Sequence, residues 1–536
     1  MRRLCRILFS RYTICALVIA VDIALMSYIL FYSVYLYFWI FGIAVLCDAA
    51  VVLSLINREA NPEFKVSWLV VVLVMPLFGA LLYLLFYSRR MSRRDSARME
   101  RITERISVYM KTEESDNALS SLAQKSRGLA GQVYSLLDSD PLSSAYRGSD
   151  FRYFSDQREL YGAMLRAIEE AERYIYLEYF IVEDGAMWRG IYDRLLEKVK
   201  SGVEVRMLYD DIGCMSTLPW DFDLKLRREG ISCYRFSRVT PKVTSVHNNR
   251  DHRKILVVDG CIAFTGGVNI ADEYINLKQP YGHWKDGGAV VCGEAALGFT
   301  ALFLSLYDFT TGKESDYEAL LGEGARSEIS ASCARLRGAE RNPLLPYENK
   351  SASAGCLIPF GTGPKPAYKN QVGKLAIINA LYSAVDYVYI TTPYLIIDYE
   401  LTEALRMAAQ RGVDVRIITP GVADKRIVKI MTKGSYETLI KAGVRIFEYA
   451  KGFIHEKLLV VDGELAVIGT INLDYRSLVH HFECALFACE SKEISRVREG
   501  FMATLRDSVE ITEKTAALSF IERCVRYTVR IFAPLM

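Results

Sequence analysis

The chain has 536 residues and a formal net charge of +3, from 66 basic and 63 acidic side chains. A chain of this length exceeds what one hydrophobic core usually organises, so we expect more than one domain. The near balance of charge lacks the basic excess of a nucleic-acid-binding protein, so we expect no nucleic-acid partner. Composition leaves the oligomeric state open.

The start of the chain is far more apolar than the rest and predicts a transmembrane anchor over 1–90. Residues 13–56 are almost wholly apolar, and their acidic residues are Asp22 and Asp48. Because about 20 residues span a bilayer, this stretch predicts two helices in succession, and 67–87 predicts a third. Such long apolar stretches do not fit a cleavable signal peptide, so we expect a retained anchor of two to three helices.

Basic residues flank both ends of the anchor. The larger cluster follows it and comprises Arg89, Arg90, Arg93, Arg94, Arg98 and Arg101. The smaller cluster precedes it and comprises Arg2, Arg3, Arg6 and Arg11. The positive-inside rule favours the cytoplasm for both, which three full spans do not allow, so either the N-terminus is translocated or one apolar stretch is re-entrant. The larger cluster predicts a cytoplasmic location for the downstream chain, a basic connecting helix over 91–145, and attraction to anionic lipids.

Beyond this point the sequence repeats one α/β unit, over 146–310 and again over 356–510, with a polar linker over 311–355 between the copies. Each copy has an apolar strand, a helical stretch and a second strand, at 174–181, 191–199 and 202–208 and at 387–394, 401–409 and 412–418. This pattern is typical of an internal duplication. The last segment, 511–536, has apolar residues at helical spacing among arginines and predicts an amphipathic helix that lies on a membrane or packs against the preceding domain.

The pattern His-x-Lys-x-x-x-x-Asp occurs once in each copy. Its residues are His252, Lys254 and Asp259 in the first copy and His455, Lys457 and Asp462 in the second. A glycine-containing turn follows each motif and ends in Asn269 or Asn472. Each motif runs into a predicted strand, where residues two apart project from one face, so histidine and lysine are expected to point the same way. Two half-sites of this kind predict one shared active site.

These residue types suit the cleavage of a phosphodiester. A neutral imidazole can attack phosphorus and a protonated one can donate to the leaving oxygen, so two histidines can divide the roles of nucleophile and general acid. The lysines and asparagines supply donors for the non-bridging phosphate oxygens. No other histidine or cysteine cluster has clear metal-ligand spacing, so we expect no catalytic metal and no cofactor.

The paired motifs resemble those of the phospholipase D superfamily, and the surrounding sequence is similar to that of bacterial cardiolipin synthases. The resemblance covers nearly the whole chain. Its further residues are Asn61-Pro62, Lys65, Trp68, Pro76, Gly79 and Tyr83 in the anchor, Leu177-Glu178-Tyr179 in the first copy, and Thr392-Pro393-Tyr394 and Asn472-Leu473-Asp474-Tyr475-Arg476-Ser477 in the second. It implies an α/β fold in which N-terminal transmembrane helices precede two pseudo-symmetric phospholipase D-type repeats that share one active site.

The resemblance also implies a role for each site residue. One motif histidine forms a covalent phosphohistidine and the other protonates the leaving alcohol. We assign these roles to His252 and His455, and pseudo-symmetry keeps the reverse assignment open. The motif aspartates are implied to be structural. A carboxylate orients each ring, and the matching positions are Asp286 in the first half and Glu483 in the second, for which a surface ion pair is the alternative.

The implied reaction transfers a phosphatidyl group from one phosphatidylglycerol to another in the bacterial cell membrane, releases glycerol and forms cardiolipin. The alternative is a phospholipase D, or a transferase that uses another alcohol or phosphatidylethanolamine. A nuclease of the same superfamily is a third hypothesis. Two positions depart from the superfamily pattern, because Gly267 replaces a frequent serine and Lys365 follows Gly363-Pro364 where an acid is frequent.

Overall fold

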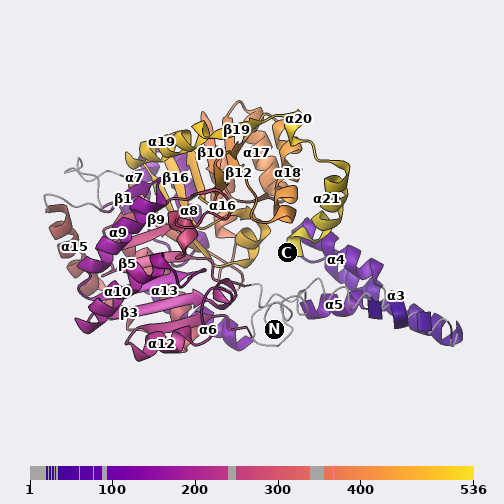
Figure 1. Ribbon diagram of the computed structural model, residues 1–536, viewed down its shortest axis with the longest axis horizontal. Helices are drawn as coiled ribbons and strands as arrows, with labels where there is room; N and C mark the ends of the chain where they lie inside the picture. The colour runs from indigo at the N-terminus through magenta and orange to yellow at the C-terminus, as the bar shows by residue number, and fades with distance from the viewer. Residues whose placement is uncertain are drawn as a thin grey trace. The chain divides into compact units, whose positions relative to one another are not determined.

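The computed structural model describes residues 20–21, 23–25, 27–28, 31, 34–59, 61–75, 78–86, 93–239, 249–338, 355–365 and 367–535. The chain divides into two compact units. Unit 1 comprises Met1–Arg90, Lys242–Val246 and Tyr527–Met536, and unit 2 comprises Met91–Pro241 and His247–Arg526. Figure 1 shows both units as a ribbon, with many of the helices and strands labelled.

The helices of unit 1 are apolar. They include α3 (Val34–Ile56), α4 (Pro62–Val74) and α5 (Gly79–Phe86). Within the described part of the chain, Phe38–Ile56 is the one stretch long and apolar enough to cross a membrane. Its side chains Trp39 and Leu46 are 73% and 72% exposed, as expected of a helix that faces lipid. The first predicted span lies mostly before Val34, largely outside the described residues.

The predicted third span is instead a helical hairpin. α4 and α5 have 13 and 8 residues, and at about 1.5 Å per residue they reach only about 20 and 12 Å, short of a ~30 Å bilayer core. The rings of Trp68 and Tyr83 meet edge to face, with centroids 5.6 Å apart. A Cβ atom on Gly79 would lie 2.6 Å from the Val71 carbonyl oxygen, so glycine permits this close approach. The prediction of one spanning helix over 67–87 is therefore wrong.

Unit 2 begins with three helices where the sequence predicted one connecting helix. They are α6 (Arg93–Met110), α7 (Glu113–Lys125) and α8 (Arg127–Ser139). Thr112 and Ser126 interrupt the segment, because their side chains accept hydrogen bonds from the first turns of α7 and α8. α6 buries Met99, Ile102 and Ile106 at helical spacing and contacts α13.

The first repeat is built on a seven-stranded sheet. Its elements are β1 (Asp150–Phe154), α9 (Gln157–Glu170), β2 (Tyr174–Tyr179), α10 (Ala186–Lys200), β3 (Glu204–Asp210), α11 (Asp211–Cys214), α12 (Phe222–Arg228), β4 (Ser232–Phe236), β5 (Lys254–Val258), β6 (Ile262–Gly266), η2 (Asp272–Ile275), β7 (His283–Lys285), β8 (Gly288–Cys292) and α13 (Ala296–Thr311). The strand order is β1-β8-β6-β5-β2-β3-β4. β2, β3 and β4 are parallel, and the other neighbours are antiparallel.

The predicted polar linker is partly helical. α14 (Tyr317–Leu321) and α15 (Glu323–Gly338) occupy its first half, and 339–354 lie outside the described residues. α13 comes just before it and is buried on all sides from Ala296 to Asp308. Its apolar surface contacts strands of the first sheet and β9 of the second, which joins the two repeats.

The second repeat follows the same plan. Its elements are β9 (Cys356–Thr362), α16 (Val372–Ser383), β10 (Tyr387–Thr391), β11 (Leu395–Ile396), α17 (Tyr399–Gln410), β12 (Asp414–Pro420), α18 (Arg426–Ile440), β13 (Arg445–Tyr449), β14 (Gly452–Ile454), β15 (Leu458–Val461), β16 (Leu465–Gly469), β17 (Leu473–Asp474), η3 (Arg476–His480), β18 (Glu483–Cys489), α19 (Glu493–Arg506) and β19 (Ser508–Ile511). After it come α20 (Glu513–Ala516), α21 (Phe520–Phe532) and η4 (Ala533–Leu535).

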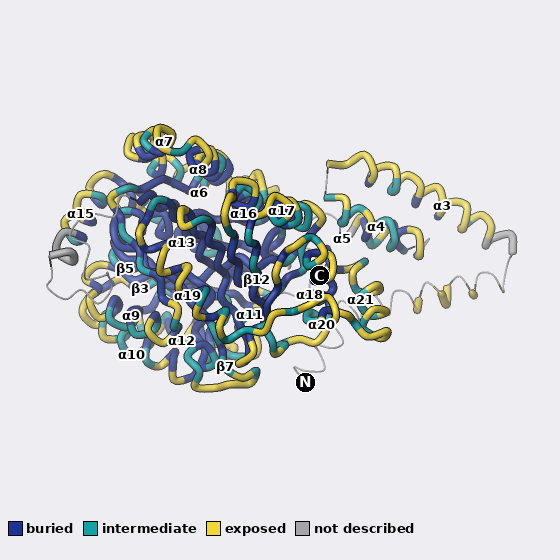
Figure 2. Tube along the Cα trace, turned by 90° about the horizontal axis from the view of Figure 1, so that it is seen from above, coloured by how far each residue is buried: buried dark blue, intermediate teal, exposed yellow. Residues whose placement is uncertain are grey.

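The two sheets match strand for strand. The second sheet has the order β19-β13-β12-β10-β15-β16-β18-β9, which repeats the order of the first with β19 added at one edge. Figure 2 shows that the strands are mostly buried, whereas α7, α10 and α17 expose one side. The predicted fold class is confirmed, because an apolar N-terminal helix precedes two repeated α/β sheets.

Candidate active site

Each motif histidine is fixed by the backbone of the other repeat. His252 lies just before β5 and His455 just before β15. The His252 amide donates to the Phe482 carbonyl at 2.9 Å, and the His455 amide donates to the Lys285 carbonyl at 2.7 Å. In addition, β7 pairs in parallel with β14, which leads into His455. The two predicted half-sites are therefore joined by reciprocal backbone contacts.

Each motif histidine also contacts a carboxylate that belongs to the other repeat. Nδ1 of His252 lies 2.8 Å from Oε2 of Glu483, and Nδ1 of His455 lies 2.8 Å from Oδ2 of Asp286. Both carboxylates are fully buried, which excludes the alternative of surface ion pairs. A carboxylate at Nδ1 holds the proton there, so Nε2 of each neutral ring carries the free lone pair.

The two carboxylates are held by different groups. Glu483 accepts hydrogen bonds from the hydroxyls of Thr470 and Ser477, at 2.5 and 2.6 Å. Asp286 accepts one from the Gly287 amide at 2.9 Å. A Cβ atom on Gly267 would lie 2.0 Å from Oδ1 of Asp286, so a serine there would displace this carboxylate. The position of Asp286 explains why glycine replaces the frequent serine.

The motif lysines are buried beside both histidines. The ammonium of Lys254 donates to the His252 carbonyl at 2.7 Å, and that of Lys457 donates to the His455 carbonyl. Burial lowers the pKa of Lys254 to about 8 and that of Lys457 to about 7. Burial, and then the charges of both lysines, lower the pKa of each motif histidine well below its usual value. Both imidazoles are therefore neutral in the free protein near pH 7.

The two asparagines that follow the motifs differ in the hydrogen bonds of their side chains. The side-chain oxygen of Asn269 accepts from the Ile181 amide at 3.0 Å, and its nitrogen donates to the Tyr274 hydroxyl at 2.7 Å. Asn472 is 4% exposed, and its side-chain oxygen has no hydrogen-bond partner among the described residues. Asn269 thus connects its loop to the segment that follows β2, whereas the side-chain oxygen of Asn472 keeps no hydrogen bond among the described residues.

The motif aspartates lie at the far ends of their strands from the histidines. Asp259 follows β5, has φ 53°, and accepts hydrogen bonds from the amides of residues 172–174 at 2.7–2.8 Å. Asp462 follows β15, has φ 51°, and accepts the equivalent bonds from residues 385–387 at 2.7–2.9 Å. Aspartate tolerates this left-handed backbone, and each carboxylate ties the turn to the start of β2 or β10.

The structure adds a third histidine that the sequence analysis missed. The ring of His481 lies 5.4 Å from that of His252, and Phe180 contacts both rings. Burial lowers the pKa of His481 to about 3. The equivalent neighbour of His455 is Trp284, with ring centroids also 5.4 Å apart. His481 and Trp284 each lie two residues before a carboxylate, Glu483 or Asp286, so an alignment of the two copies on these carboxylates could have found both.

Comparisons with known sequences identify related families. The family described as "Cardiolipin synthase, PLD-like domain" matches 164–281 and 377–505, and the one described as "Phospholipase_D-nuclease N-terminal" matches 38–86. A Streptococcus mutans protein recorded as "Uncharacterized protein" is 36% identical, over 90% of this chain and 99% of its own length. A cardiolipin synthase of Geobacillus thermodenitrificans is 32% identical, over 93% of this chain and 94% of its own length.

A solved structure has a similar fold. The crystal structure of the phosphatidylserine synthase of Haemophilus influenzae superposes with a TM-score of 0.55, covering 76% of this chain and 97% of that one. The two sequences are 14% identical, so this likeness supports the fold alone.

Proposed function

Because the chain belongs to the phospholipase D-like cardiolipin synthase family, we propose that this phospholipid transferase makes cardiolipin from two molecules of phosphatidylglycerol and releases glycerol. One observation carries the proposal. Two buried, neutral histidines face one site, and each donates Nδ1–H to a buried carboxylate from the opposite repeat at 2.8 Å. Such a pair suits a reaction with two symmetrical transfer steps.

In the proposed first step, Nε2 of His252 attacks phosphorus, and the bond from phosphorus to the glycerol oxygen breaks. His455 donates a proton to that oxygen, and glycerol leaves. The negative charge of the bound phosphodiester favours protonation of one of the two otherwise neutral rings. In the second step, His455 takes the proton of a hydroxyl on the second phosphatidylglycerol. That oxygen attacks phosphorus, the bond from phosphorus to His252 breaks, and cardiolipin forms.

The proposed phosphate ligands are the ammonium groups of Lys254 and Lys457. Both are almost fully buried beside the two histidines, where a charge interaction is little screened by water. Asn472 is a further candidate ligand. Asn269 could bind the phosphate only after its hydrogen bond to Tyr274 is broken. No step in this scheme requires a metal ion or a cofactor.

The anchor supports a two-span topology in the bacterial cell membrane. If α3 and the apolar segment before it cross the bilayer and the α4–α5 hairpin does not, both basic clusters reach the cytoplasmic side. A re-entrant α4–α5 hairpin therefore lets both arginine clusters satisfy the positive-inside rule, which three full spans would not allow. The catalytic repeats are then cytoplasmic, where phosphatidylglycerol is accessible from the inner leaflet.

The C-terminal helix α21 is a proposed second membrane contact. None of its residues is buried, and its exposed apolar side chains include Phe520 and Ile521, at 74% and 75%. Arg526 lies against Gly434 of α18, so the helix packs in part on the preceding repeat, and the exposed apolar side chains favour contact with a membrane surface. Arg523, Arg526 and Arg530 lie among the apolar residues and would attract anionic lipid headgroups.

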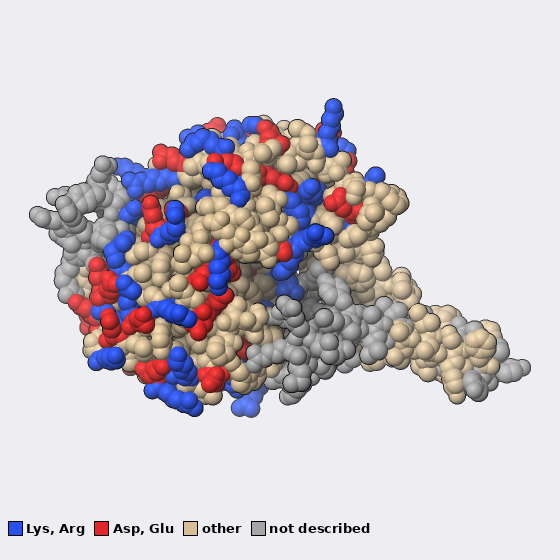
Figure 3. Space-filling view, viewed as in Figure 1, with Lys and Arg blue, Asp and Glu red and all other residues tan. Residues whose placement is uncertain are grey.

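Surface charge does not favour the nuclease alternative. On the visible face of unit 2, basic and acidic side chains are interspersed rather than gathered into a basic stripe (Figure 3). A protein that binds nucleic acid usually concentrates lysine and arginine along the path of the phosphate backbone. Lipid substrates need no such stripe.

The test is to supply membranes that contain the chain with labelled phosphatidylglycerol as the sole added lipid and to identify the products by mass. We expect cardiolipin and free glycerol, and neither with the matched His252→Ala variant. Phosphatidic acid as the sole product would indicate a hydrolase. Product formation only after another alcohol or phosphatidylethanolamine is added would indicate a different transferase.

A further inference from the structure

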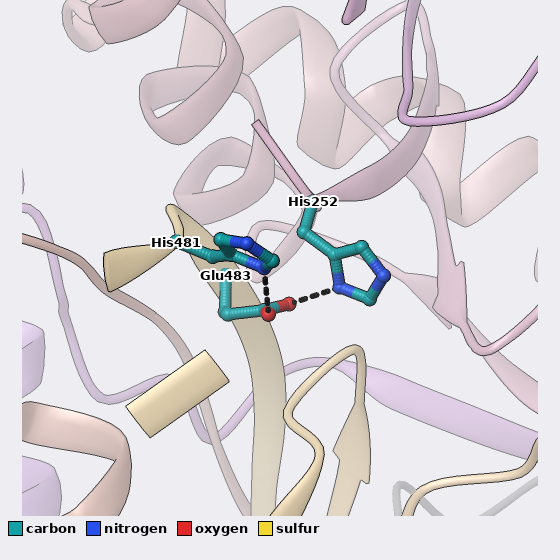
Figure 4. A group of neighbouring side chains, drawn as sticks. All are labelled: His252, His481 and Glu483. Atoms are coloured by element: carbon teal, nitrogen blue, oxygen red, sulfur yellow. Dashed lines mark hydrogen bonds and ion pairs between the residues drawn. The ribbon is translucent and has the colours of Figure 1, made fainter. Parts of the chain in front are cut away.

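His252, His481 and Glu483 form a compact group of potential metal ligands. Each offers one donor atom, and these atoms all lie within 4.8 Å of one another. Figure 4 shows both imidazole rings converging on the Glu483 carboxylate. Nδ1 of His252 lies 2.8 Å from one carboxylate oxygen, and Nδ1 of His481 lies 3.6 Å from the other.

The transfer reaction does not explain His481. The residue is 7% exposed, and neither of its ring nitrogens has a hydrogen-bond partner among the described residues. Burial of an unpaired polar group is costly, so native proteins usually provide such a group with a ligand. In the first repeat Trp284 occupies the equivalent place beside His455, so the fold itself does not require histidine there. Nδ1 of His481 faces Glu483 at 3.6 Å, too far for a hydrogen bond.

We propose that His252, His481 and Glu483 bind a divalent transition-metal ion of the zinc class, and that the bound ion inhibits the enzyme. Two imidazoles and one carboxylate form a common zinc donor set, with bonds of about 2.0–2.2 Å and a fourth position for water. Donor atoms of a tetrahedral site lie about 3.5 Å apart by this geometry, so small rotations of the two rings close the group around an ion. Both rings are neutral, which is the form that binds metal.

The inhibition follows from the tautomer of His252, and this part rests on the proposed function. A metal ion at Nδ1 replaces the proton that Glu483 otherwise accepts. The single proton of the neutral ring then resides on Nε2, the atom that attacks phosphorus, so the nucleophile has no free lone pair. The ion also occupies the carboxylate that stabilises the ring during transfer.

The neighbouring lysines oppose a cation but do not exclude it. Lys254 and Lys457 lie close enough to His252 to lower its pKa. Their ammonium groups hydrogen-bond to the backbone carbonyls of His252 and His455, and Glu483 supplies a negative charge at the ion's position. Mg²⁺ prefers oxygen ligands and keeps its waters, so we do not expect it to occupy this site.

Metal binding can be measured without turnover. The purified full chain in lipid–detergent micelles would compete with a chromophoric chelator for Zn²⁺ at pH 8, as wild type, His481→Asn and His283→Gln. His283 is a half-buried histidine outside the group, whose ring contacts Tyr449. We expect one site, weakened about tenfold or more by His481→Asn and unchanged by His283→Gln. Equal affinity in wild type and His481→Asn would overturn the proposal.

Inhibition is measured as the ratio of glycerol release with and without Zn²⁺, followed by addition of a chelator. The wild type is expected to lose activity reversibly, and Mg²⁺ to have no effect at the same concentration. In His481→Asn the half-inhibiting Zn²⁺ concentration is expected to rise about tenfold or more. Inhibition of both proteins at the same concentration would refute the inhibitory site. If neither protein releases glycerol, the proposed reaction fails, while the chelator competition still decides whether the metal site exists.

Discussion

The surroundings of His252 and His455 differ, although their motifs and sheets repeat closely. Each ring donates to a carboxylate at 2.8 Å. The partner of His252 is a glutamate held by two hydroxyls, with a second histidine beside the ring. The partner of His455 is an aspartate held by a backbone amide, with an indole beside the ring.

This comparison separates the features that the proposed transfer steps share from those that differ between the repeats. Both repeats keep a buried, neutral imidazole oriented through Nδ1, as the proposed double displacement requires, because in either role Nε2 would face the phosphate. The groups that hold the carboxylates lie outside the motif and vary. They are the places where a pseudo-symmetric pair can become a nucleophile and an acid.

The largest expected effect on turnover comes from replacing either carboxylate, and the two variants are expected to slow different stages of the reaction. Glu483→Gln and Asp286→Asn each remove a charged acceptor of Nδ1–H, and each is expected to slow turnover by about 10- to 100-fold. The assigned roles predict different stages. In a rapid-quench experiment with labelled phosphatidylglycerol, Glu483→Gln is expected to slow formation of the protein adduct, because the nucleophile is misoriented. Asp286→Asn is expected to slow both formation and release of the adduct. Identical time courses for the two variants would contradict the asymmetric assignment.

The next effect concerns the lysines, whose pKa values differ between the half-sites. Because the charged forms are the proposed phosphate ligands, kcat/KM is expected to fall as pH rises through about 7 for Lys457 and about 8 for Lys254. The fall approaches about tenfold per pH unit for each lysine once pH exceeds its pKa. In a Lys457→Arg variant that keeps activity, the fall is expected to begin only near pH 8, because arginine stays charged. An unchanged profile in that variant would show that Lys457 does not control the decline.

A smaller effect is expected from the hydroxyls around Glu483. Thr470→Val and Ser477→Ala each remove one hydrogen bond to this carboxylate, at a cost of about 1 kcal/mol, or about fivefold in rate. Asp286 accepts no hydroxyl in the described part of the chain, so no equivalent variant exists for His455. Steady-state glycerol release, with the fold checked by circular dichroism, measures the effect. A loss as large as that of Glu483→Gln would mean that the hydroxyls do more than hold the carboxylate.

The smallest effect on rate is expected for the motif aspartates, whose hydrogen bonds are equivalent in the two repeats. Asp259→Asn and Asp462→Asn weaken equivalent sets of three hydrogen bonds to backbone amides. Each substitution is expected to lower the free energy of unfolding by about 1–3 kcal/mol, with little change in the rate per folded enzyme. Denaturant titration of both variants checks this, and a rate loss comparable to that of the carboxylate variants would place these aspartates in the chemistry.

The sequence predicted the repeated features well, because the duplication displays each signal twice. The paired motifs and the strand positions follow from alignment of the two copies, and the resemblance implied the carboxylates Asp286 and Glu483. Their exchange between repeats did not follow, because it depends on backbone contacts such as that of His252 with Phe482. His481 was missed for a different reason, because it matches Trp284 in position but not in residue type and therefore did not repeat as a motif.

The anchor was predicted less well because composition alone fixes neither length nor direction. Residues 67–87 are apolar enough for one span, yet the chain reverses between α4 and α5. The contact between Trp68 and Tyr83 and the close approach at Gly79 stabilise this reversal. Such contacts between residues that face each other across a turn have no periodic signature in the sequence.

The most direct test of the two-histidine mechanism is to locate the covalent intermediate. A His455→Ala variant lacks the proposed acid and base, so phosphatidyl transfer to the protein is expected to stall after the adduct forms. Incubation with labelled phosphatidylglycerol, digestion and mass spectrometry should place the label on His252 and nowhere else. A label on another residue, or continued cardiolipin synthesis without any adduct, would contradict the mechanism.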